Sequence, residues 1–222
     1  MEQAKIPFVL GIVGKSDVGK TTLILKLIPE LTKRGYKVGT VKNCPHGFDI
    51  DRKGKDSWKF SKEGSRGVLL TSQKKIALIK STEENSDILK IIDSLFYDFD
   101  IVLVEGFSKE QRLKKVEILR KGISEQIDLS LNEVIAIVSD IDVKVDKPIF
   151  KPDQIYAIVD FLEKIMKKEK KSVEVIVNGE KIFLNNFLQN MVKSLTLAIV
   201  DPLRRKGEEE VKEVVIKVSK TK

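Results

Sequence analysis

The 222-residue sequence predicts an α/β protein with a doubly wound, mostly parallel sheet, followed by a small α+β C-terminal domain. The apolar run Ile6–Val13 leads through a glycine-containing loop into Thr21–Arg34, where apolar residues recur at helical spacing. Tyr36–Val41 is a second short strand, so the chain opens with the βαβ unit of a parallel sheet. A charged run, Lys167–Lys171, then separates this pattern from a shorter one.

The first domain is predicted to span residues 1–168. Pro29 falls inside the first helix, where proline can introduce a kink, and Gly35 supplies a C-terminal stop. Asn43–Asp56 is polar and contains proline and glycine, which predicts a long functional loop, and Ile101–Val104 predicts a central strand buried on both faces. The other predicted elements are helices at Asp56–Glu63, Glu84–Phe96 and Pro152–Met166, and strands at Val68–Thr71, Lys75–Lys80, Val116–Leu119 and Val134–Val138.

The second domain, residues 172–222, has a ββαβ-like pattern. An Asn-Gly pair between two short apolar runs is typical of a tight hairpin turn. The sequence assigns no role to this unit. Its predicted elements are the hairpin strands Val173–Val177 and Lys181–Leu184 around Asn178-Gly179, a helix from an Asn185 cap to about Val200, and a strand at Val211–Val218.

The strongest functional signal is a phosphate-loop motif. The segment Gly14-Lys-Ser-Asp-Val-Gly-Lys-Thr21 matches G-x-x-x-x-G-K-[ST] between an apolar strand and a helix. Such a loop turns successive backbone N–H groups inward as an anion cradle, and the helix N-terminus reinforces it. Lys20 is expected to contact β- and γ-phosphates, and the Thr21 hydroxyl to bind Mg²⁺. The predicted nucleotide-binding residues of this phosphate-loop NTPase domain are Gly14, Lys15, Ser16, Asp17, Val18, Gly19, Lys20, Thr21 and Thr22.

Two carboxylates at strand ends are candidate members of the same site. Glu105 follows a buried strand, where a carboxylate orients Mg²⁺-bound waters or activates a water. Asp140 follows the Val134–Val138 strand and is a candidate for reading a guanine base, although no N-K-x-D tetrapeptide occurs. A helix or turn cap is the alternative interpretation of Asp140.

Charge and cysteine content exclude several classes of protein. The net charge of +8 divides into +6 for residues 1–171 and +2 for residues 172–222, and only 6% of residues are aromatic, so no basic nucleic-acid-binding face is indicated. Cys44 is the one cysteine, which excludes a structural disulfide and favours a cytoplasmic location. The N-terminal apolar run Ile6–Val13 has eight residues, is interrupted by Pro7 and Gly11 and leads straight into Gly14–Lys20, which does not fit a signal peptide or a membrane span. Neither nucleic acid nor a membrane is an expected partner.

Several stretches beyond the phosphate loop indicate which kind of nucleotide-binding protein this is. They are the loop helix and second strand Val18–Gly39, then Phe48-Asp-Ile-Asp51, Gly54-Lys-Asp-Ser-Trp58, Val104-Glu-Gly-Phe107 and Ala136–Asp140. Together they make the sequence similar, over roughly residues 6–165, to the B proteins of molybdopterin-guanine dinucleotide biosynthesis, the MobB family. Asn43, Cys44 and Pro45 depart from that family, which carries more histidine at this point.

The resemblance implies GTP and Mg²⁺ as ligands, weak GTP hydrolysis, and an accessory role in forming molybdopterin guanine dinucleotide for a molybdenum or tungsten cofactor. It implies molybdopterin or a MobA-type guanylyltransferase as partner, and a homodimer. Carried over by position, Asp49 and Glu105 would be catalytic, and Thr21, Asp51 and Glu105 would hold the metal. The resemblance also supports Asp140 as the base contact.

Two other functions stay open. The protein could be a scaffold whose nucleotide state gates a partner interface, with hydrolysis incidental. It could also be a partitioning-type ATPase, because Lys15 occupies the position of the extra lysine in their phosphate loops. Those ATPases carry an acidic pair after the second strand, where this chain has Val41-Lys42-Asn43.

Overall fold

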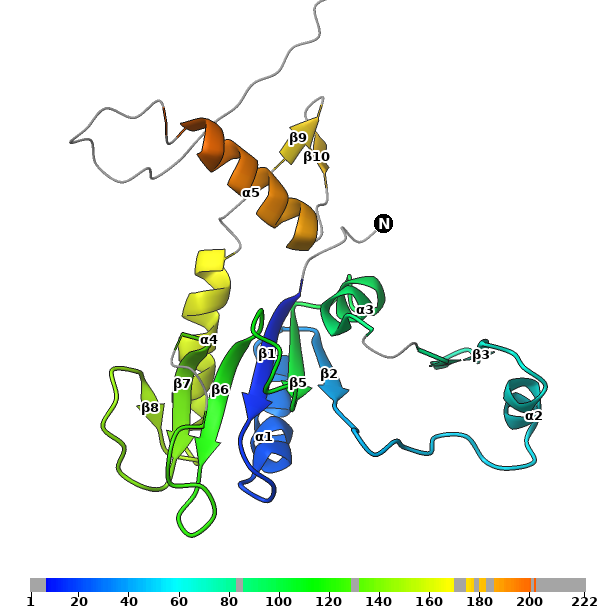
Figure 1. Ribbon diagram of the computed structural model, residues 1–222, viewed down its shortest axis with the longest axis horizontal. Coiled ribbons are helices and arrows are strands. Elements are labelled where there is room, and N and C mark those ends of the chain that lie inside the picture. The colour runs from blue at the N-terminus through cyan, green and yellow to red at the C-terminus, as the bar shows by residue number, and fades with distance from the viewer. Residues whose placement is uncertain are drawn as a thin grey trace, which may run out of the picture.

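A six-stranded sheet forms the centre of the protein (Figure 1). The computed structural model describes residues 7–82, 86–128, 132–169, 175–177, 180–182, 186–200 and 202. All neighbouring strands of this sheet pair in parallel, in the order β2-β5-β1-β6-β7-β8, which confirms the predicted fold class. The strands are β1 (Phe8–Val13), β2 (Val38–Lys42), β5 (Ile101–Glu105), β6 (Lys114–Leu119), β7 (Val134–Ser139) and β8 (Ile149–Phe150).

Helices cover both faces of this sheet. On one face, α1 (Lys20–Lys33) and α4 (Ile155–Glu169) pack over the larger core cluster. On the other, α3 (Ile88–Leu95) buries Ile92 against β5 in a separate cluster. Gly39 of β2 and Phe96, which follows α3, lie close together. A Cβ on Gly39 would lie 2.6 Å from the Phe96 ring, so only glycine fits there without a shift. The parallel topology brings the carboxyl ends of β1, β2, β5, β6 and β7 to one edge.

Local sequence explains where the first helix ends. α1 runs through Pro29 to Lys33, and Gly35 follows with a φ of +86°. Its N–H donates to Thr32 O, and the N–H of Tyr36 donates to Leu31 O. This arrangement satisfies carbonyl groups at the helix end and requires a residue that adopts positive φ, so Gly35 is the predicted stop.

Other boundaries differ from the predictions. β8 was not predicted, because two residues after a proline carry no strand periodicity. The helix predicted from Glu84 begins at Ile88, where the Asp87 side chain accepts the N–H of Leu89. The charged run after Met166 does not break the last helix at Lys167, because lysine and glutamate favour helix and α4 continues to Glu169.

A separate arm leaves the sheet after β2. It consists of α2 (Asp56–Lys62) and the antiparallel hairpin of β3 (Gly67–Thr71) and β4 (Ile76–Lys80), and Figure 1 shows it apart from the sheet. Val68 is buried, whereas Leu69, Ile76 and Leu78 are exposed. The register pairs Leu69 with Leu78 and Thr71 with Ile76, so these apolar side chains share one face of the hairpin.

The C-terminal unit contains the predicted hairpin and helix. β9 (Val175–Val177) pairs antiparallel with β10 (Glu180–Ile182), and α5 (Asn186–Val200) follows. The predicted turn at Asn178-Gly179 and strand at Val211–Val218 lie outside the described residues, and the division into domains 1–168 and 172–222 stays a prediction. Within the described part of the chain, no helix has the length and apolarity needed to cross a membrane.

Candidate functional site

The phosphate loop connects β1 to α1 and is shaped by two glycines with positive φ. Gly14 has a φ of +140°, and a Cβ there would lie 2.7 Å from the Ile118 carbonyl oxygen and 3.0 Å from Val18 Cγ2. Gly19, with a φ of +104°, precedes the first turn of α1. Val18 is buried in the main core and fixes the middle of the loop. The motif residues therefore lie between strand and helix as the sequence predicts.

Lys20 folds its side chain back over the loop. Its Nζ donates to the carbonyl oxygens of Gly14 at 3.0 Å and Lys15 at 2.6 Å. This position places one positive charge among the backbone groups that form the predicted cradle. Such a charge complements phosphate oxygens, as the motif requires.

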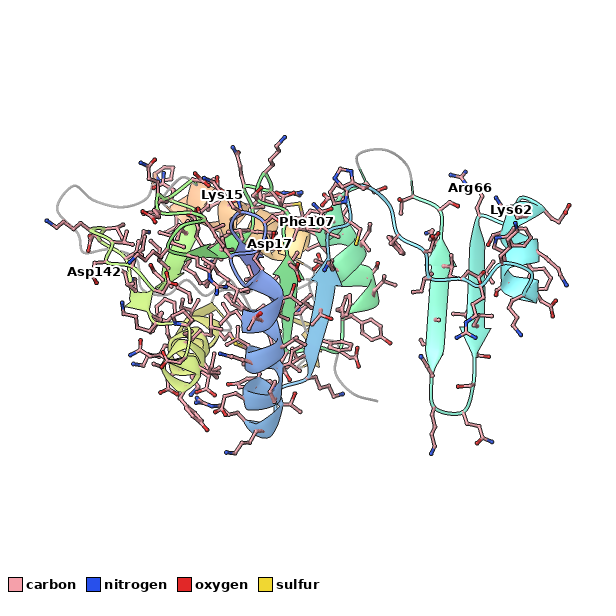
Figure 2. All side chains as sticks on the ribbon, turned by 90° about the horizontal axis from the view of Figure 1, so that it is seen from below. Lys15, Asp17, Lys62, Arg66, Phe107 and Asp142 are labelled. Atoms are coloured by element: carbon pink, nitrogen blue, oxygen red, sulfur yellow. The ribbon has the colours of Figure 1, made fainter. Side chains whose placement is uncertain are left out.

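The tip of the loop faces solvent. Lys15, Ser16 and Asp17 are exposed, and Asp17 adopts a φ of +61°. The Lys15 ammonium lies 3.9 Å from an Asp128 carboxylate oxygen, and both side chains are about half exposed. An exposed pair at this distance contributes little to stability, so Lys15 is available to a ligand. Figure 2 shows Lys15 and Asp17 at the N-terminal end of α1.

Thr21 and Glu105 meet beside the loop. The Thr21 hydroxyl donates to Glu105 Oε2 at 2.8 Å, and Lys42 Nζ lies 3.5 Å from Glu105 Oε1. The strand register positions Glu105, because it aligns with Ile12 of β1 and with Lys42 of β2. The Glu105 side chain is 14% exposed, so this ion pair is partly shielded from solvent.

The donor set beside the loop fits Mg²⁺ bound together with a nucleotide. The Thr21 hydroxyl and the Glu105 carboxylate are hard oxygen donors, and Mg²⁺ commonly takes one or two protein oxygens plus phosphates and waters. Among the described residues, no cluster of three or more His, Cys, Asp or Glu side chains is arranged to hold a metal ion. The Thr21 and Glu105 oxygens are thus a donor pair that needs phosphates and waters to complete the coordination of Mg²⁺.

Asp49 and Asp51 are not brought to this pair. Asp51 Oδ1 accepts the hydroxyl of Ser57 at 2.8 Å and the N–H of Arg52 at 2.9 Å. Ser57 belongs to α2, and Figure 1 shows α2 far from β5 and α1. Figure 2 likewise shows Lys62, at the end of α2, away from the phosphate loop. The catalytic role of Asp49 and the metal role of Asp51 stay predictions.

Asp140 has a defined contact in the structure. Its Oδ1 accepts the backbone N–H of Lys121 at 2.9 Å, which ties the turn after β6 to the end of β7. This contact is of the turn-capping kind that the alternative interpretation predicts, and it lies at the carboxyl edge of the parallel strands, where the phosphate loop also lies. Base recognition by Asp140 stays a prediction.

Sequence reasoning missed two basic residues beside the site. Lys42 was expected just outside the second strand but ends β2, where it pairs with Glu105. Arg120 follows β6, and its Nη1 lies 3.9 Å from the position of a Cβ on Gly19. No motif marks Arg120, because its proximity to the loop depends on β6 lying next to β1.

Comparisons with known proteins place the chain among proteins of molybdopterin-guanine dinucleotide biosynthesis. The family model described as "Molybdopterin guanine dinucleotide synthesis protein B" matches residues 9–140. The chain is 33% identical over 159 residues to a molybdopterin-guanine dinucleotide biosynthesis adapter protein of Haemophilus influenzae, covering 69% of this chain and 86% of that protein. The adapter protein of Escherichia coli is 32% identical over 165 residues, covering 72% and 94%.

A putative adapter protein of Methanocaldococcus jannaschii is 25% identical over 237 residues, which covers 96% of this chain and 99% of that protein. The C-terminal unit therefore also occurs in a relative. Among solved structures, a molybdopterin-guanine biosynthesis protein B aligns with a TM-score of 0.57 and 30% identity, covering 72% of this chain and 99% of that chain. Bacillus subtilis MobB aligns with a TM-score of 0.56 at 23% identity, covering 70% and 96%, and supports the fold.

Proposed function

The chain belongs to the MobB family, and on this premise we propose that it is a GTP-binding adapter in molybdopterin-guanine dinucleotide biosynthesis. It binds GTP with Mg²⁺, hydrolyses it slowly, and assists the transferase that joins a guanine nucleotide to molybdopterin. The metal that the finished cofactor carries is molybdenum or tungsten. The observation that carries the proposal is the Thr21–Glu105 hydrogen bond beside a phosphate loop that already holds the Lys20 ammonium.

Each residue has a separate task in this proposal. The loop N–H groups and Lys20 bind the phosphates, and Lys20 exchanges its two carbonyl contacts for phosphate oxygens. Thr21 and Glu105 hold Mg²⁺, which when bound neutralises phosphate charge. Glu105 also lies 3.5 Å from the Lys42 ammonium, which holds its carboxylate at the end of β5 beside Thr21.

An equilibrium titration with GTP, GDP and ATP in Mg²⁺ tests the proposal. Wild type is expected to prefer GTP over ATP, and Lys20→Ala to lose at least tenfold in GTP affinity, because it removes a charge-assisted contact. Lys26→Ala removes an equal charge from an exposed position of α1 and is the matched control. Equal affinity for ATP and GTP would contradict the guanine assignment, in which Asp140 reads the base.

Transfer assays with a MobA-type guanylyltransferase and molybdopterin separate the adapter from a nucleotide-independent scaffold. The proposal predicts that Lys20→Ala supports less dinucleotide formation than wild type or Lys26→Ala. Full transfer by Lys20→Ala would favour a scaffold that acts without bound GTP.

The proposal includes a homodimer formed through the arm. An isolated two-stranded hairpin is marginally stable in water, and β3 and β4 leave Leu69, Ile76 and Leu78 exposed on one face. A second copy of the same face would cover these side chains. Light scattering is expected to give twice the chain mass for wild type and the chain mass for Leu78→Glu; a wild-type monomer would refute this part.

A further inference from the structure

We propose that Arg120 is a nucleotide-binding residue, whose guanidinium binds the phosphates that GDP and GTP share. This inference rests on the proposed GTP-binding function and adds a basic residue from outside the phosphate-loop motif. Its basis is the position of Arg120 at the end of the loop opposite to that held by the Lys20 side chain.

The strand order brings Arg120 to the loop. β6 is the neighbour of β1, and the Ile118 carbonyl lies directly against Gly14, where a Cβ would come within 2.7 Å of its oxygen. Arg120 follows two residues later, and its Nη1 lies 3.9 Å from the Cβ position of Gly19. The guanidinium therefore lies beside the last residue of the loop before α1 begins.

The backbone of Arg120 is held firmly. Its N–H donates to Ser124 O at 2.9 Å, and the Ser124 N–H donates back to Arg120 O at 2.9 Å. The next N–H, of Lys121, donates to Asp140, and that of Gly122 donates to Glu125 Oε1 at 2.7 Å. These bonds fix the turn, so the direction in which the side chain leaves the sheet is set before a ligand binds.

The guanidinium itself has no structural partner among the described residues. Arg120 is exposed, and within that part of the chain no hydrogen bond or ion pair involves its side chain. By contrast, Arg34 and Arg112 are each bound by carboxylates. An arginine with a fixed backbone, a head group that none of the described residues binds and a neighbouring phosphate loop suits an anionic ligand, because its planar fork matches phosphate oxygens.

The Lys20 and Arg120 side chains lie at opposite ends of the phosphate loop. Lys20 Nζ contacts the carbonyls of Gly14 and Lys15 at the start of the loop, and Arg120 approaches Gly19 at its end. Since Lys20 is the expected contact of the β- and γ-phosphates, Arg120 faces the α- and β-phosphates. Its contribution should therefore be the same for GDP and GTP.

Titration of GTP and GDP in Mg²⁺ against wild type, Arg120→Ala, Arg120→Lys, Lys20→Ala and Lys26→Ala tests this assignment. Arg120→Ala is expected to weaken both nucleotides by the same factor, about tenfold to a hundredfold. Arg120→Lys should recover part of the loss, and Lys26→Ala should bind like wild type. Because Arg120 is exposed, its variants should unfold at the wild-type temperature without nucleotide.

The possible results distinguish a failure of the proposed function from a failure of this inference alone. If wild type binds neither nucleotide, both fail. If Lys20→Ala loses binding while Arg120→Ala keeps wild-type affinity, the GTP-binding function stands and the role of Arg120 is refuted. If Arg120→Ala weakens GTP but leaves GDP unchanged, the contact is to the γ-phosphate, and the assignment to the shared phosphates is wrong.

Discussion

Replacing Gly14 with alanine tests whether the shape of the phosphate loop is set by packing against β6. The new Cβ would lie 2.7 Å from Ile118 O and 3.0 Å from Val18 Cγ2. The first neighbour is a backbone atom of a sheet strand, so it cannot rotate away. The loop must shift instead, and its N–H groups lose their alignment toward a phosphate.

The magnitude follows from two costs. An L-residue at positive φ costs about 1–2 kcal/mol, and overpacking of a closely packed site adds about 1–3 kcal/mol. Gly35→Ala is the matched control, because Gly35 also has positive φ but has nothing within 4 Å of its Cβ position. It should show the first cost alone, so Gly14→Ala should be the less stable variant by about 1–3 kcal/mol.

Urea unfolding measures the stability difference, and calorimetric titration measures GTP affinity in the same preparations. Gly14→Ala should lose at least tenfold in GTP affinity, whereas Gly35→Ala should bind as wild type does. Equal destabilisation by the two substitutions, with wild-type GTP affinity in Gly14→Ala, would show that packing against β6 does not set the shape of the phosphate loop.

Two ion-pair clusters give further predictions. The Arg112 guanidinium, by hydrogen bonding, lowers the pKa values of Asp87 and Glu110, so their stabilisation is present above pH about 4 and is lost as the pH falls further. Arg112→Gln should therefore be less stable than wild type at pH 7 and should lose less stability on acidification to pH 3, as urea unfolding would show; an unchanged pH profile would contradict this. Lys115 is fully buried and pairs with Glu133, so Glu133→Gln should cost about 2–4 kcal/mol by leaving a buried ammonium without its counter-charge, and a cost below 1 kcal/mol would refute the pairing.

The sequence predicted the fold well wherever periodicity was strong. The strands Ile6–Val13 and Ile101–Val104 were recognisable as runs of mostly apolar residues, and the helix between the first two strands by apolar residues at helical spacing. The strand predicted at Val116–Leu119 begins two residues earlier in the structure, because β6 starts at Lys114 and includes Lys115. Lys115 is tolerated because its ammonium donates to Ser108 O and binds Glu133, contacts that span 7 and 18 residues.

The candidate site was predictable in the parts that are local in sequence. The phosphate loop is eight consecutive residues, and Glu105 at the end of a buried strand lies at the carboxyl edge beside Thr21, where ligands of such sheets bind. Arg120 was missed because only the strand order relates it to Gly19. Asp51, expected near the metal by family resemblance, accepts the Ser57 hydroxyl beside α2, and its metal role stays a prediction.

The proposed function requires Thr21 and Glu105 to form a Mg²⁺ site for a nucleotide held by the phosphate loop. The most direct test is GTP titration of wild type and Thr21→Val, each in Mg²⁺ and in excess chelator. Valine keeps the shape of threonine but removes the hydroxyl that meets Glu105 at 2.8 Å. Wild type should bind GTP more tightly with Mg²⁺, and Thr21→Val should bind with nearly the same affinity in both conditions. A Thr21→Val protein that keeps the full wild-type gain from Mg²⁺ would contradict the claim.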